Sequence, residues 1–116
     1  MRRRDNMQTM QVPLQITFRN LPSSEAIASR INQQFAKLYR FCDRIINCQV
    51  VVEIPHQHHH KGNPYHIRIK LTLPGEELVI NQDSSDKLHK NVYVAIREAF
   101  DAAQQKVKRF ADVQKV

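Results

Sequence analysis

The sequence is poor in the residues that active sites and nucleotide-binding loops require. Glycine occurs only at Gly62 and Gly75, so a glycine-rich loop that cradles phosphate groups is excluded. Neither a GxSxG nor an HExxH motif is present, which removes two common hydrolase signatures. We therefore predict that the protein is not an enzyme and uses no cofactor.

Cysteine and long apolar runs are also scarce. Cys42 and Cys48 are the two cysteines, too few for a disulfide scaffold, and we expect both to be small core residues in a reducing compartment. No apolar run approaches the ~20 residues of a membrane-spanning helix. The basic first residues are not followed by a hydrophobic segment, as a signal peptide would require. We expect a cytoplasmic protein that does not bind membranes.

Positive charge is what the chain has in excess. Its 116 residues include 18 Lys and Arg against 11 Asp and Glu, a net charge of +7. This length predicts one domain over residues 11–112, with a flexible basic extension at 1–10 and a short tail at 113–116. The charge favours a polyanionic partner, but a soluble protein can also simply be basic. The placement of the cations must therefore decide.

Alternating and helical apolar patterns predict the order β-α-β-β-β-α. Residues 12–18, 48–54, 65–73 and 77–81 alternate as strands do, and Pro74-Gly75 is a tight-turn signal. A helix is expected from the Ser23-Ser24 cap to about residue 44, and another from a start within 85–91 to Phe110. The fold class is α+β: a two-layer sandwich in which two helices cover one face of a four-stranded mixed sheet.

Both predicted helices carry a basic row beside their apolar stripe. Arg97 and Lys108 follow Lys90 at offsets that nearly superimpose on a helical wheel. One such row is usually only a solvated face, whereas two rows on helices that pack against the same sheet favour a polyanion-binding surface. The row on the first helix consists of Arg30, Lys37, Arg40 and Arg44.

Further polar and aromatic residues leave alternatives open. Arg68 and Lys70 either extend the positive surface around the sheet or only keep its open face soluble. Tyr39 and Tyr93 could stack on RNA bases, although a half-buried tyrosine with a wet hydroxyl is the commoner situation.

The histidine-rich loop is a weak metal signal. His56, His58 and His60 would face one way in an extended segment, but Glu53 is the nearest acid and no cysteine lies nearby. We therefore expect no metal site. A pH-sensitive contact to phosphate is the softer alternative, because histidine titrates near neutrality.

Three segments, FAKLYRFCDRIINCQVVVEI, YHIRIKLTLPGEELVI and VYVAIREAFDAAQQKVKRF, resemble the ribosome hibernation-promoting factors. This family includes ribosome-associated inhibitor A and was historically called sigma-54 modulation protein. The similarity covers about residues 10–112. It implies the same β-α-β-β-β-α fold, which is related in shape to double-stranded-RNA-binding domains.

The resemblance also implies a function. Members of the family bind the small ribosomal subunit, in the cleft for messenger RNA and the A- and P-site tRNAs, and idle ribosomes in stationary phase or stress. Lys37 and Arg44 fall in the matching motif of the first helix, and Lys106, Lys108 and Arg109 fall in the basic end of the last. With the cations of the two rows, the expected ribosomal-RNA contacts are Arg30, Lys37, Arg40, Arg44, Lys87, Lys90, Arg97, Lys106, Lys108 and Arg109.

The expected partners are the small subunit, its RNA and the whole 70S ribosome. The chain resembles the short form of the family, so ribosome dimerisation would need a second factor, and the free protein is expected to be a monomer. Two other functions remain open. One is a general double-stranded-RNA-binding module, and the other is a protein-binding transcription regulator.

Overall fold

The structure is a computed structural model that describes residues 12–55, 65–83 and 91–114. Its element order is the predicted β-α-β-β-β-α. No helix in the described part of the chain is long and apolar enough to cross a membrane. The elements are β1 (Leu14–Arg19), α2 (Glu25–Phe41), β2 (Asn47–Glu53), β3 (His66–Leu73), β4 (Glu76–Asp83) and α3 (Val92–Gln114).

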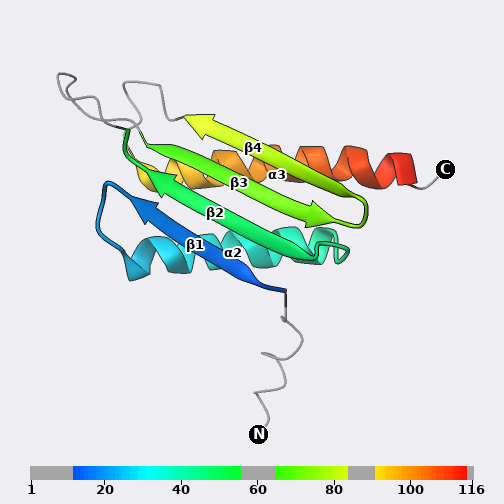
Figure 1. The fold of residues 1–116 in the computed structure, drawn as a ribbon, viewed down its shortest axis with the longest axis horizontal. Helices are drawn as coiled ribbons and strands as arrows, with labels where there is room; N and C mark the ends of the chain where they lie inside the picture. The colour runs from blue at the N-terminus through cyan, green and yellow to red at the C-terminus, as the bar shows by residue number, and fades with distance from the viewer. Residues whose placement is uncertain (1–11, 56–64, 84–90, 115–116) are drawn as a thin grey trace, which may run out of the picture.

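The four strands form one mixed sheet in the order β1-β2-β3-β4. β1 and β2 are parallel, with Leu14 opposite Cys48, and the other two pairs are antiparallel. A parallel pair needs a crossover, and α2 supplies it. Figure 1 shows α2 and α3 side by side on the same face of the sheet, running in the same direction. The predicted two-layer sandwich is confirmed.

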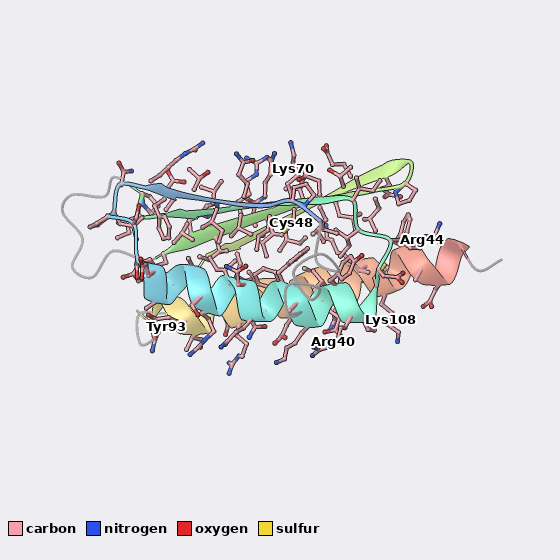
Figure 2. The ribbon with its side chains drawn as sticks, turned by 90° about the horizontal axis from the view of Figure 1, so that it is seen from below. Arg40, Arg44, Cys48, Lys70, Tyr93 and Lys108 are labelled. Atoms are coloured by element: carbon pink, nitrogen blue, oxygen red, sulfur yellow. The ribbon has the colours of Figure 1, made fainter. Side chains whose placement is uncertain are left out.

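The core lies between the sheet and the two helices. Alternate residues of β2 and β3, such as Val50 and Ile69, are fully buried, as the period-2 pattern of a half-covered strand requires. Ile31 and Phe35 of α2 fill the space above them. Cys48 lies between the sheet and the helices (Figure 2). Cys42 and Cys48 are both buried and form no disulfide bond, as predicted.

Helix α2 starts where the sequence predicts and ends earlier. The Oγ atom of Ser24 accepts a hydrogen bond from the Ile27 N–H at 3.2 Å, an N-terminal cap. The predicted end near residue 44 is wrong, because α2 stops at Phe41 and Cys42 is extended. The extended residue and the turn after it carry Cys42 and Ile45 into the core. Both side chains are therefore buried without a longer helix, although the apolar pattern continues through them.

Helix α3 begins just after the predicted window. The carboxamide oxygen of Asn91 accepts a hydrogen bond from the Tyr93 N–H at 2.8 Å, so Asn91 caps a helix that begins at Val92. The buried stripe of α3 includes Ala95, Ala99 and Ala103.

Two residues with positive φ fix the corners of the sheet. Gly75, with φ 76°, follows Pro74 in the β3–β4 turn, where glycine has no steric penalty. Asn20, with φ 64°, follows β1, and its Nδ2 donates to the Ile54 carbonyl oxygen at 3.0 Å. This bond ties the end of β1 to the end of β2.

We predict that Asn20→Ala lowers the free energy of unfolding by about 1–2 kcal/mol, because alanine disfavours the left-handed conformation and cannot donate the bond. Asn20→Gly, which keeps the backbone conformation, should cost less. Urea denaturation of both variants measures the difference. Equal stability of the alanine and glycine variants would contradict this role of Asn20.

Burial raises the pKa of the Cys48 thiol from 9.0 to about 12. The thiol therefore stays protonated through pH 9 while the chain is folded, and a thiolate is the reactive form. In a Cys42→Ala variant, Cys48 should react with a disulfide reagent only after unfolding in guanidinium. Fast reaction of the folded variant at pH 8 would contradict this burial.

Candidate nucleic-acid interface

The outer sides of α2 and α3 form one surface on the side opposite the sheet. In Figure 2, Arg40 and Lys108 extend from this side, whereas Lys70 extends from the far side of the sheet. We call this surface the helix face. Its exposed cations are Arg30, Lys37, Arg40, Arg97 and Lys108.

The row on α2 begins at the boundary with α3. The Arg30 guanidinium carbon lies 4.9 Å from the centroid of the Tyr93 ring, a cation–π contact between the two helices. Lys37 follows Arg30 after seven residues and so lies on the same side of α2, while Arg40 points further outward. The row thus runs along the junction of the helices.

Arg44 is not part of that helical row, because α2 ends before it. The prediction of a four-residue row on one helix is therefore wrong at this position. The Arg44 guanidinium carbon instead lies 5.8 Å from the centroid of the Phe110 ring of α3. Arg44 is exposed at one end of the helix pair and remains close to the basic end of α3 (Figure 2).

The cations of α3 are divided between different sides of the helix. The Lys106 Nζ atom donates a hydrogen bond to the Val79 carbonyl oxygen of β4 at 3.2 Å, so this side chain reaches the edge of the sheet. Arg109 is exposed but lies ~100° around the helix from Lys108. Among the predicted cations of α3, Arg97 and Lys108 lie on the side shared with α2.

Some predicted residues cannot be placed. Lys87, Lys90 and the loop containing His56, His58 and His60 lie outside the described residues. Within residues 12–55, 65–83 and 91–114, no group of three or more His, Cys, Asp or Glu side chains is arranged to hold a metal ion.

A groove of about 360 Å³ lies between the two helices on the helix face. Phe41, at the end of α2, is 46% exposed there, while Leu38 and Phe100 are buried. We call this hollow the interhelical groove. Its lining residues are Gln34, Lys37, Leu38, Arg40, Phe41, Phe100, Asp101 and Gln104.

The exposed aromatic residue at this surface is neither of the two tyrosines, both of which are half-buried, the commoner of the two situations expected. Tyr39 is half-buried against Phe35, with ring centroids 6.2 Å apart, and Tyr93 is half-buried beneath Arg30. Phe41 was missed, although it follows Lys37 by four residues and Leu38 by three and so lies between the basic row and the apolar stripe of α2.

The open face of the sheet carries fewer exposed cations than the helix face, because Arg19 and Arg68 are exposed there and Lys70 is half-buried. A hollow of about 260 Å³ includes Arg19, Arg68 and Lys70, but Glu53 also lines it. The Lys70 Nζ atom lies 3.7 Å from a carboxylate oxygen of Glu77, an exposed ion pair. The helix face is therefore the better candidate for a polyanion.

Solved structures of two other proteins have the same fold as this chain. A ribosomal subunit interface protein from Coxiella burnetii is 14% identical with a TM-score of 0.70. The N-terminal domain of Protein Y from Thermus thermophilus is 26% identical with a TM-score of 0.65. Each match covers 87% of this chain and 99% of the other. The first likeness shows the fold alone.

The sequence itself identifies the family. No curated protein matches it. Residues 14–115, however, match the family described as sigma 54 modulation protein / S30EA ribosomal protein, which confirms the resemblance found from the three segments. The chain belongs to the sigma 54 modulation protein / S30EA ribosomal protein family.

Proposed function

We propose that the protein binds the small ribosomal subunit through its helix face and idles ribosomes under stress or in stationary phase. The bound protein occupies the cleft for messenger RNA and the A- and P-site tRNAs. The observation that carries this proposal is the continuous set of cations along the junction of α2 and α3, in a chain of a ribosomal protein family.

Binding of this kind needs complementary shape and charge rather than bond chemistry. Arginine can contact a phosphate group through two parallel N–H donors, and lysine acts as a compact point charge. Two helices packed on one sheet hold Arg40 and Lys108 on a common surface, so the backbone positions of these cations are set before RNA binds. Inhibition then follows from exclusion of messenger RNA and tRNA from the occupied cleft.

The same surface is compatible with a general double-stranded-RNA-binding module, which would bind an isolated duplex as well as it binds a subunit. A protein-binding transcription regulator would instead bind a polypeptide, and its affinity would change little with salt concentration. The ribosomal part of the family description favours the ribosome over a general duplex-binding module. The exposed cations of the helix face favour it over a protein-binding regulator.

Neutralising Arg40 and Lys108 together, as Arg40→Gln/Lys108→Gln, should weaken binding to small subunits roughly 10- to 100-fold, because two charge-assisted phosphate contacts are lost. The matched control is Arg68→Gln/Lys70→Gln, which removes one arginine and one lysine from the open sheet face. Co-sedimentation of labelled protein with small subunits measures both variants.

Arg40 and Lys108 are chosen for this comparison in preference to Arg30 and Arg44. Arg30 and Arg44 also cover aromatic rings of α3, so their replacement would change packing as well as charge. Equal weakening by the helix-face and sheet-face pairs, with unchanged melting temperatures, would show that net charge rather than the helix face determines binding.

Affinity for the small subunit should also fall steeply with salt. If about five phosphates are neutralised, the logarithm of the association constant should decrease with the logarithm of salt concentration with a slope of about −4. A titration of salt on the unmodified protein measures this slope. A slope near zero would favour the protein-binding alternative.

A further inference from the structure

We propose that the interhelical groove takes up a single unstacked RNA base, which lies against the exposed ring of Phe41. The inference rests on the proposed binding of RNA by the helix face and adds a specific subsite to it. It assigns a role to Phe41, which the charge of the surface does not explain.

The groove has an apolar floor and a cationic rim. Leu38 and Phe100 are almost fully buried, whereas nearly half of the Phe41 surface remains open to solvent. Leaving a phenylalanine in water forgoes the free energy that its burial would supply. Lys37 and Arg40 line the same hollow and are exposed. An aromatic ring beside two cations is the arrangement with which proteins stack a base and hold its phosphate.

The two tyrosine rings near this surface already make contacts within the protein. Tyr39 packs against Phe35, and the Arg30 guanidinium covers the Tyr93 ring. Phe41 is the exposed aromatic residue among the described ones. A base that stacks at the junction of the helices therefore has Phe41 as its platform.

The size and charge of the groove select the occupant. Its volume of about 360 Å³ is at the small end of ligand sites, suitable for one flat ring with its sugar rather than for a duplex. Cations at the rim favour a ligand with phosphate groups over an apolar segment of a basic protein. Because paired bases remain stacked, the ligand must be a single-stranded or bulged nucleotide.

Polar side chains in the groove favour a particular base edge. Asp101 and Gln104 of α3 and Gln34 of α2 line the hollow together with Phe41. An ionised carboxylate only accepts hydrogen bonds, and guanine presents two adjacent N–H donors on its Watson–Crick edge. Uracil presents one. We therefore expect the groove to prefer guanine.

The test uses the full chain and two labelled five-nucleotide RNAs, UUGUU and UUUUU, with fluorescence anisotropy as the readout. The unmodified protein should bind UUGUU more tightly. Phe41→Leu, which keeps an apolar side chain without the aromatic ring, should weaken UUGUU binding about 5- to 150-fold, the range found for loss of one stacked base. Phe41→Tyr should bind like the unmodified protein.

A second variant separates recognition of the base from general electrostatics. Asp101→Asn removes a negative charge and should strengthen binding of UUUUU. For UUGUU the loss of a carboxylate acceptor offsets that gain, so the ratio of UUGUU to UUUUU affinity should fall toward one. A purely electrostatic role of Asp101 would leave that ratio unchanged and would overturn the guanine preference.

The outcomes distinguish this proposal from the proposed function. If Phe41→Leu binds UUGUU as the unmodified protein does, the base subsite is wrong, whatever the small-subunit result. If Phe41→Leu weakens small-subunit binding or self-association without changing RNA affinity, the groove meets protein instead, which also overturns it. If Phe41→Leu weakens UUGUU binding but the unmodified protein does not bind small subunits, the base subsite is upheld and the ribosome is refuted as the partner.

Discussion

Burial of only one face of the four-stranded sheet is the constraint on which the rest of the structure depends. The strands place their fully buried side chains on that face, and a parallel β1–β2 pair requires α2 to return across it. α3 covers the remaining area beside α2. Because both helices lie on the same side, their polar sides form one continuous surface, on which cations from distant parts of the sequence meet.

Cation–π contacts of α2, and of the turn that follows it, with α3 then shape that surface. Arg30 covers Tyr93 near the start of the pair, and Arg44 approaches Phe110 near its end. Such contacts hold guanidinium groups in place while leaving them exposed. Phe41, the last residue of α2, is exposed in the interhelical groove. The helix face therefore combines ordered charge with one exposed ring, and both properties suit folded RNA with unpaired bases.

The fold could be predicted from the sequence because period-2 and helical patterns report burial directly. The end of α2 could not, since the helical pattern continues through Cys42 to Ile45 and these two side chains are buried although the helix ends at Phe41. The candidate site was predicted in outline from its charge. The position of Lys106 at the edge of β4 and the exposure of Phe41 depend on how α3 packs beside β4 and α2, which no local pattern specifies.

We propose above all that the helix face recognises the small ribosomal subunit. Sedimentation of the purified chain with isolated small subunits, large subunits and whole ribosomes on sucrose gradients tests it most directly. We expect the protein to travel with small subunits and with whole ribosomes, and to stay at the top of the gradient when only large subunits are present. Absence from the small-subunit fractions, or equal association with large subunits, would contradict it.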